Sequence, residues 1–255
     1  GHTGSLDPLA TGVLPLCFGE ATKFSQFLLD ADKRYQATFK LGVITDSGDA
    51  DGKVLETRPV PEIGDSKLES VLENYRGEIS QIPSMFSALK VNGQPLYKLA
   101  RQGIEIERKP RQVTIHELSV LERRQDEITV DVHCTKGTYV RSLAEDIGME
   151  LGCGAHVIEL RRLAAGPYTV DEAVSMKQLE ALAEDKAQLD AKLQPVSSAV
   201  QDWPQVELTE ITASYIRQGQ PVQIANAPTA GWVSIFSESD DPNDEFIGVG
   251  EVTDD

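Results

Sequence analysis

The chain opens with the stretch GHTGSLDPLATGVLP, residues 1–15, which holds three glycines, two prolines and a single carboxylate, Asp7. Pro8 has no N–H group and disfavours helical backbone at Asp7. The glycines allow tight turns or a close approach of two backbones. These features predict an irregular loop that presents Asp7, and loops on a rigid scaffold often carry functional groups. The residues alone leave two interpretations open: a functional carboxylate, or an Asp that caps a turn.

Length and composition limit the possible classes of protein. The 255 residues, 40% of them hydrophobic, suffice for one large core or for one core and a small second domain. No apolar run approaches the ~18 residues that cross a bilayer. The three cysteines, Cys17, Cys134 and Cys153, are widely spaced, which argues against a disulfide framework and favours a reducing cytoplasm. Cys153 and His156 lack the paired spacing of a zinc site, so no metal is expected.

The net charge of −17 is unevenly distributed along the chain. Residues 1–170 contain 24 acidic and 20 basic residues, whereas residues 171–255 contain 17 acidic and only 4 basic ones. The segment 85–111 has six basic against two acidic residues and is the best basic patch. Because local patches decide contact with phosphates, RNA binding and an ordinary solvated surface both stay open for this segment.

Apolar and polar residues alternate from Lys33 to Val43, which predicts a half-buried strand with Tyr35 and Phe39 on its apolar side. Tyr35 is then either a core residue or part of a site. Further strands are expected at 111–121 and 128–134, and helices at 20–30, 66–75 and 175–184. Capping boxes are expected at the starts of two of these helices, Ser66 with Glu69 and Ser175 with Gln178.

Another helix is expected within TKGTYVRSLAEDIG, residues 135–148, with Thr138 as its N-cap. Val140 begins its buried stripe, and Arg141 lies off that stripe in the first turn. A cation in the first turn opposes the helix dipole, so Arg141 calls for an explanation. It is either a functional residue or a surface arginine paired with Glu145.

The segment DSGDADG, residues 46–52, resembles a calcium loop. The twelfth position counted from Ser47 is Arg58 instead of the required Glu, so we interpret the segment as an acidic turn.

From Val206 onward the pattern changes to short β runs, at 206–208, 222–224, 232–236 and 246–249, with a small helix near 212–217. This predicts a small β-rich domain. The acidic residues from Glu238 to Glu245 and at the C-terminus make it a poor binder of phosphates.

Four motifs of this chain closely resemble the signatures of the bacterial tRNA pseudouridine-55 synthases, the TruB family. They are the loop 1–15, the pair Arg34–Tyr35, KGTYVRSL at 136–143 and GCGAHVIELRR at 152–162. The resemblance implies an α+β fold, the pseudouridine synthase fold, with a mixed, largely antiparallel sheet and flanking helices. It also implies a catalytic domain over 1–200 with a basic RNA-binding insertion at about 84–111, followed by a PUA-like RNA-binding domain over 201–255.

Family members usually carry a further strand-bearing segment before the GHTG loop. We therefore expect the chain to lack the N-terminal segment of the family.

The resemblance also implies roles for individual residues. Asp7 is the catalytic carboxylate, Arg141 is its salt-bridge partner, and Tyr35 stacks on the target base and is a candidate general base. The remaining residues expected to bind substrate are His2, which fills the gap left in the RNA stack, Tyr139 and Leu160 in the base pocket, and Lys23. Arg161 and Arg162 either face phosphate or form a charged strand end.

These roles imply isomerisation of uridine to pseudouridine at position 55 in the T-loop of tRNA, with base flipping. A carboxylate beside C1′ can attack it or stabilise developing positive charge, as in glycosidases, and no metal or redox cofactor is required. We expect Asp7 to work ionised, with Arg141 lowering its pKa. The expected partner is the tRNA T-arm, with no membrane, guide RNA or obligate protein partner, and the expected form is a cytoplasmic monomer.

Two other functions stay open. The chain could be an RNA-binding or RNA-folding module in which catalysis is lost or secondary. It could also be a hydrolytic N-glycosidase, which would release free uracil.

Overall fold

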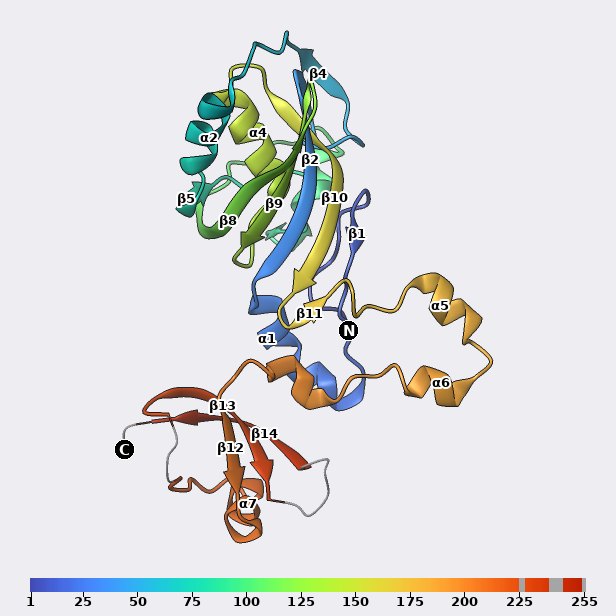
Figure 1. Ribbon diagram of the computed structural model, residues 1–255, viewed down its shortest axis with the longest axis vertical. Helices are drawn as coiled ribbons and strands as arrows, with labels where there is room; N and C mark the ends of the chain where they lie inside the picture. The colour runs from blue at the N-terminus through green and yellow to red at the C-terminus, as the bar shows by residue number, and fades with distance from the viewer. Residues whose placement is uncertain (225–227, 239–244, 254–255) are drawn as a thin grey trace. The chain divides into compact units, whose positions relative to one another are not determined.

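The computed structural model describes residues 1–224, 228–238 and 245–253 (Figure 1). The chain forms two compact units. The first comprises residues 2–15 and 29–172, and the second comprises residue 1, residues 16–28 and residues 173–255. Each unit is described by itself.

The first unit is built on a mixed sheet with the strand order β1-β10-β2-β9-β8-β5, to which β11 is added beside β10. The strands are β1 (Thr11–Gly12), β2 (Lys33–Leu41), β5 (Gly77–Gln81), β8 (Arg111–Arg123), β9 (Glu127–Cys134), β10 (Ala155–Ala165) and β11 (Tyr168–Thr169). All neighbouring pairs are antiparallel except β1 with β10, which is parallel. The predicted α+β fold with a largely antiparallel sheet is confirmed.

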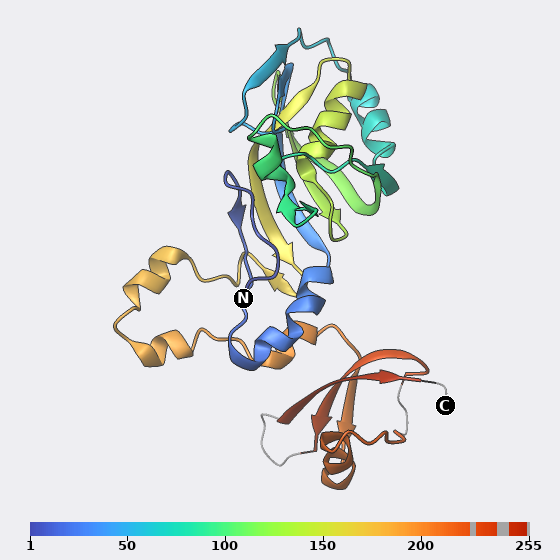
Figure 2. The ribbon, with the colours of Figure 1, turned by 180° about the vertical axis from the view of Figure 1, so that it is seen from behind.

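Two helices, α2 (Asp65–Glu73) and α4 (Val140–Glu150), cover one face of this sheet (Figures 1 and 2). The core lies between them and the sheet and is formed by large apolar side chains that are fully buried, including Phe39, Leu72, Ile115, Ile128, Leu143 and Ile147. The alternation predicted for residues 33–43 is confirmed, since Ala37, Phe39 and Leu41 on β2 are buried.

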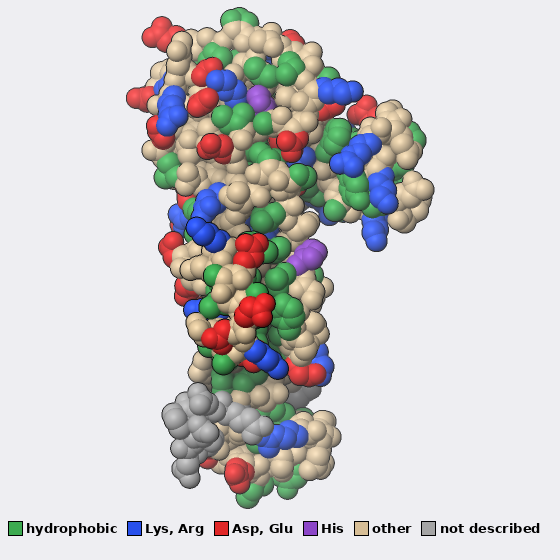
Figure 3. Space-filling view, turned by 90° about the vertical axis from the view of Figure 1, so that its right-hand side faces the viewer, with side chains coloured by type: hydrophobic (Ala, Val, Ile, Leu, Met, Phe, Trp, Pro, Cys, Tyr) green, Lys and Arg blue, Asp and Glu red, His purple; other side chains and the backbone are tan. Residues whose placement is uncertain are grey.

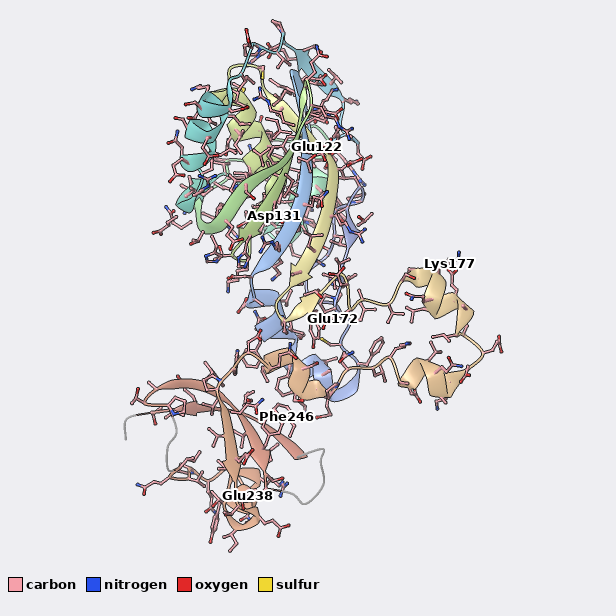
Figure 4. The ribbon with its side chains drawn as sticks, viewed as in Figure 1. Glu122, Asp131, Glu172, Lys177, Glu238 and Phe246 are labelled. Carbon is pink, nitrogen blue, oxygen red and sulfur yellow. The ribbon has the colours of Figure 1, made fainter. Side chains whose placement is uncertain are left out.

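Smaller elements complete the first unit. The hairpin of β3 (Val43–Thr45) and β4 (Val54–Thr57) follows β2. The basic segment 84–111 contains a second hairpin, of β6 (Lys90–Val91) and β7 (Gln94–Pro95), and the short helix α3 (Leu96–Ala100). The outer surface of the sheet is polar, and Asp131 of β9, labelled in Figure 4, lies 2.8 Å from the Arg34 guanidinium of β2.

Two predictions about helices are wrong in detail. The helix predicted at 20–30 is a 3-10 helix, η1 (Gly19–Phe24), followed by a short α-helix, α1 (Ser25–Asp30). The Thr22 and Ser25 hydroxyls donate to carbonyls three residues back, which tightens these turns. The capping box predicted at Ser66 does not form, because the helix begins one residue earlier and Glu69 accepts a hydrogen bond from Arg76.

The second unit contains a three-stranded sheet in the order β12-β13-β14, with β12 (Gln205–Leu208), β13 (Gly231–Ser237) and β14 (Glu245–Val252). The helix α7 (Glu210–Arg217) is capped by Thr209 and packs on a small core of five side chains, Val206, Leu208, Ala213, Val233 and Ile235. The strand predicted at 222–224 is wrong: these residues adopt no strand, and Ile224 contributes only its side chain to the core.

The second unit also includes residues 173–200, which the sequence assigns to the first domain, so the division at residue 200 stays a prediction. These residues form α5 (Met176–Ala181), α6 (Lys186–Asp190) and the 3-10 helix η2 (Val196–Val200). The capping box predicted at Ser175 is confirmed. Most of the acidic run 238–245 lies outside the described residues.

Aromatic rings explain why residues 16–28 belong to the second unit. The Phe27 ring contacts Trp203 and Trp232, with centroids 4.9 and 5.6 Å apart. Phe24 contacts Phe246, which is labelled in Figure 4, at 5.6 Å. None of the described helices is long and apolar enough to cross a membrane.

Candidate active site

The loop that carries Asp7 is closed at its base by backbone hydrogen bonds. Thr3 N–H donates to the Pro15 carbonyl (3.3 Å), and Ala10 N–H donates to the carbonyl of Asp7 itself (2.9 Å). Gly12 pairs with Arg162 of β10, and a Cβ atom at Gly12 would lie only 2.1 Å from the Arg162 carbonyl oxygen. Gly12 also has a φ of 109°, so only glycine fits this close approach.

Asp7 and Arg141 form the salt bridge that the sequence predicts. Arg141 Nη2 donates to Asp7 Oδ1 (3.2 Å), and Arg141 Nε lies 2.9 Å from Asp7 Oδ2. The guanidinium therefore faces both carboxylate oxygens, one through a hydrogen bond and the other through an ion-pair contact, which restricts the orientation of the carboxylate. The Asp7 side chain is 36% exposed, so one side of the carboxylate can meet a substrate.

Arg141 is buried rather than on the surface, so the alternative of a surface arginine is wrong. Only 4% of the residue is exposed. Arg141 donates to the carbonyls of Ser47 (3.1 Å) and Phe86 (3.0 Å) in addition to Asp7. Burial of a charge requires such pairing, and the sequence pattern of the helix alone could not reveal partners from three separate loops.

The start of α4 is held by side chains that bond to backbone. The N-cap of α4 is Tyr139 and not the predicted Thr138, whose hydroxyl donates back to Thr135. The Gln81 amide, which is fully buried, accepts from Tyr139 N–H (3.0 Å) and donates to the Tyr139 carbonyl (3.3 Å). These two hydrogen bonds between the Gln81 side chain and the Tyr139 backbone fix the turn from which Arg141 projects.

Asp49 is a second acidic partner of Arg141 that sequence reasoning missed. Asp49 Oδ2 lies 3.4 Å from Arg141 Nη1, and both side chains are about 5% exposed. The other oxygen, Oδ1, accepts from the Ser47 hydroxyl (2.5 Å) and from Asp51 N–H (3.1 Å). The signal was present in the acidic turn 46–52, but the sequence does not show that this turn bridges to Val157 beside the site.

The pKa of Asp7 is raised overall, whereas the sequence led us to expect a lowered value. Burial of the carboxyl raises the pKa above its ordinary value of 3.8, and the charge of Asp49 raises it further. Arg141 acts in the opposite direction but has the smaller effect. The site therefore makes Asp7 a stronger base than an exposed aspartate.

Tyr35 lies on β2 opposite Arg162 of β10 and Val132 of β9. Burial raises the pKa of the Tyr35 hydroxyl, and the positive charge of Arg162 only partly opposes this. Tyr35 is therefore a neutral phenol at rest, and any role as a general base requires its proton to leave during the reaction.

Leu160 shares the face of the sheet that holds Tyr35, because directly opposed strand residues point to the same side and Leu160 is opposite Ala37. Leu160 is buried, and Tyr139 is half-buried. His2 is exposed at the start of the loop. Lys23 belongs to the second unit, where it pairs with Glu20 at 2.5 Å. Tyr35 and Leu160 thus lie on one sheet and Arg141 on its covering helix α4, and Arg141 joins them to Asp7 on the loop before β1.

The face of the molecule shown in Figure 3 carries acidic and basic side chains interspersed with one another. The described residues contain no group of three or more His, Cys, Asp or Glu side chains that could hold a metal ion.

Three family models together match almost the whole chain. Their descriptions are TruB family pseudouridylate synthase (N terminal domain) for residues 1–140, tRNA pseudouridylate synthase B C-terminal domain for 141–201, and Pseudouridine synthase II TruB, C-terminal, for 204–255.

Individual proteins resemble the chain over its full length. It is 56% identical over 257 residues to tRNA pseudouridine synthase B of Ectopseudomonas mendocina, and 54% identical over 258 residues to the Coxiella burnetii protein of the same name. In both comparisons the match covers 100% of this chain and 82% of the relative.

Solved structures share the fold. The crystal structure of a Cbf5–Nop10–Gar1 complex matches with a TM-score of 0.69 and 26% identity, over 93% of this chain and 66% of that chain. An H/ACA RNP bound to a substrate RNA containing 2′-deoxyuridine matches with a TM-score of 0.68 and 25% identity, over 93% and 65%.

Proposed function

Because the chain belongs to the TruB family of pseudouridylate synthases, we propose that it isomerises uridine to pseudouridine in tRNA, at position 55 of the T-loop. The observation that carries the proposal is the ion pair in which Arg141 of α4 faces both oxygens of the Asp7 carboxylate. Asp7 itself lies on a loop that backbone hydrogen bonds close at its base. The names of the relatives support tRNA as the substrate, and the T-loop position follows from the resemblance of the four motifs.

The reaction breaks the bond from C1′ to N1 of uracil, turns the base and joins C1′ to C5. The proton on C5 is lost and N1 gains one, so no atom other than hydrogen is exchanged. Asp7 acts at the sugar, either as a nucleophile or as a charge that stabilises an electron-poor C1′. Because uracil delocalises the charge of the broken bond and is recaptured, one carboxylate suffices and no metal or redox cofactor takes part.

The target uridine must leave its stack to reach Asp7, which costs a few kcal/mol. Tyr35 offers an aromatic face on the same sheet, and stacking on such a face returns about 1–3 kcal/mol per base. In this proposal Tyr35 gives its hydroxyl proton to N1 of uracil and then takes the proton from C5, so the phenol is restored at the end of the reaction. Leu160 and Tyr139 line the base pocket in this proposal, and His2 occupies the gap in the RNA stack.

The basic segment 84–111 positions the T-arm through its phosphates, with Lys23 as a further contact. We assign residues 1–200 to the catalytic domain and residues 201–255 to a PUA-like RNA-binding domain. The protein acts as a monomer, without a guide RNA or an obligate protein partner.

Release of tritium to water from tRNA labelled at C5 of uridine tests the proposal, because only formation of the C1′–C5 bond displaces that hydrogen. We expect release from a transcript with U55 and none from a matched transcript with C55. Tight binding of the U55 transcript without release would instead support the RNA-binding or RNA-folding module. Free uracil among the products would indicate an N-glycosidase.

A further inference from the structure

Arg162 is a buried arginine on β10 for which the sequence leaves two interpretations, contact with phosphate or a charged strand end. Both interpretations place the side chain of Arg162 in solvent, but the residue is only 2% exposed, so neither describes it. A buried guanidinium must find partners for its N–H groups, so its bonding pattern shows what it does.

The guanidinium of Arg162 binds the Asp7 loop at two places. Nε donates to the Val13 carbonyl (2.8 Å), and Nη2 donates to the Gly4 carbonyl (3.0 Å). The backbone carbonyl of Arg162 accepts in turn from Val13 N–H (3.0 Å). Gly4 precedes Asp7 and Val13 follows it, so one side chain joins the two limbs of the loop that presents the carboxylate.

Arg162 also reaches the second reactive side chain of the site. It lies directly opposite Tyr35 across the β2–β10 pair, so both side chains share one face of the sheet. The positive charge of Arg162 also acts on the Tyr35 hydroxyl, where it lowers the pKa against the larger effect of burial. The residue that bonds to the Asp7 loop is therefore also the direct neighbour of Tyr35 on one face of the sheet.

We propose that Arg162 is a positioning residue that fixes the Asp7 loop and the Tyr35 side chain relative to each other. The inference rests on the proposed function, because it assigns both residues to one reaction. Arg162 acts through these partners and does not touch the RNA.

Lysine cannot replace this fork, since it carries a compact charge whose donors do not have the planar spacing of a guanidinium. A displacement of a reacting group by about 1 Å can cost about a hundredfold in rate. We therefore expect R162K to lower kcat for tritium release by about ten- to a hundredfold. KM should stay within about threefold, because the surface that meets the tRNA is unchanged.

R76K is the matched control. Arg76 also donates through Nε and Nη2 to a carbonyl, that of Leu118 on β8, but its other hydrogen bonds go to Glu69 and Glu73 of α2 and not to the Asp7 loop. It should change stability without changing kcat. Both variants are assayed at a temperature at which circular dichroism shows them folded, and R162Q serves in place of R162K should the lysine variant not fold.

Hydrogen exchange of the unliganded proteins gives a second readout. The amides of Thr3 and Ala10 should exchange faster in R162K and stay unchanged in R76K. A kcat within twofold of the unaltered protein, or a fall in kcat shared equally by R76K, would overturn the inference. If the unaltered protein releases no tritium, the proposed function fails, and the exchange rates alone then decide whether Arg162 holds the loop.

Discussion

Arg141 is shared by two carboxylates, Asp7 and Asp49, which differ in their surroundings. Asp49 is buried, with one oxygen accepting two hydrogen bonds and the other facing Arg141, whereas Asp7 keeps part of its surface exposed. The two carboxylates therefore have different roles. Asp49 balances the charge of Arg141 inside the protein. Asp7 has a raised pKa and lies where a substrate can reach it.

This arrangement predicts the pH dependence of the reaction. Asp7 works ionised and its pKa is raised, so activity should fall as the pH drops through a value above that of an ordinary aspartate. Asp49 contributes to the raised pKa, and D49N removes its charge. In D49N, the acid limb of the profile of kcat against pH should therefore move to lower pH.

The control for this prediction is D51N, an exposed aspartate on the same turn, which should leave the acid limb in place. An acid limb that stays fixed or moves to higher pH in D49N would contradict the coupling between Asp49 and Asp7.

Glu145 on α4 links pH to stability. Burial raises its pKa to about 7 from 4.5, with Asp146 adding to the effect. Because the folded pKa is above the unfolded one, folding favours the protonated form, and this contribution is lost as the pH rises from about 4.5 through about 7. E145Q mimics the protonated form, so it should match the unaltered protein near about pH 4 and be the more stable near about pH 8.

Urea unfolding at the two pH values measures this difference. E180Q, an exposed glutamate on α5, should show the same free energy of unfolding as the unaltered protein at both. Equal effects of E145Q at both pH values would show that Glu145 titrates normally.

At the scale of elements, the parallel pairing of β1 with β10 fixes the loop to the sheet. It is only two residues long, and Gly12 allows the two backbones to approach. G12A should destabilise the protein by about 3 kcal/mol or more, because both backbone strain and a backbone clash result. G77A, which has a similar positive φ with no atom near the added Cβ, should cost only about 1–2 kcal/mol.

The free energies of unfolding of G12A and G77A, each compared with that of the unaltered protein, test this prediction. If G12A costs no more than G77A, the close approach of Gly12 to Arg162 does not constrain the loop.

The long elements could be predicted from the sequence because each is periodic. The alternation at 33–43 and the apolar stripe from Val140 both match the structure. Asp49 and the burial of Arg141 could not be predicted in the same way, because they depend on contacts between Ser47, Phe86 and α4 that no local pattern encodes. The salt bridge of Asp7 with Arg141 was available only through the resemblance to a family.

At the scale of the whole molecule, charge is segregated along the chain. The net charge of −17 comes mostly from residues after 170, and the segment 85–111 carries a local excess of basic residues. Its Lys98 and Arg101 are exposed on and after α3. A strongly acidic protein can therefore still present a basic surface to RNA.

If this segment binds phosphates, its variants should change the salt dependence of tRNA binding. The double variant K98Q/R101Q should lower the slope of log affinity against log salt by about 1.5, since each phosphate contact contributes about 0.7–0.9. K177Q/K186Q, which removes two exposed lysines of residues 173–200, should leave the slope unchanged. Equal slopes for the two double variants would remove the segment from the RNA interface.

The central claim is that the carboxylate of Asp7 performs the chemistry, and single-turnover tritium release by D7N tests it most directly. Asn keeps the size of the side chain and removes the charge. We predict that D7N binds the U55 transcript within about threefold of the unaltered affinity and releases tritium at least about a thousandfold more slowly. Release by D7N at the unaltered rate would contradict the account.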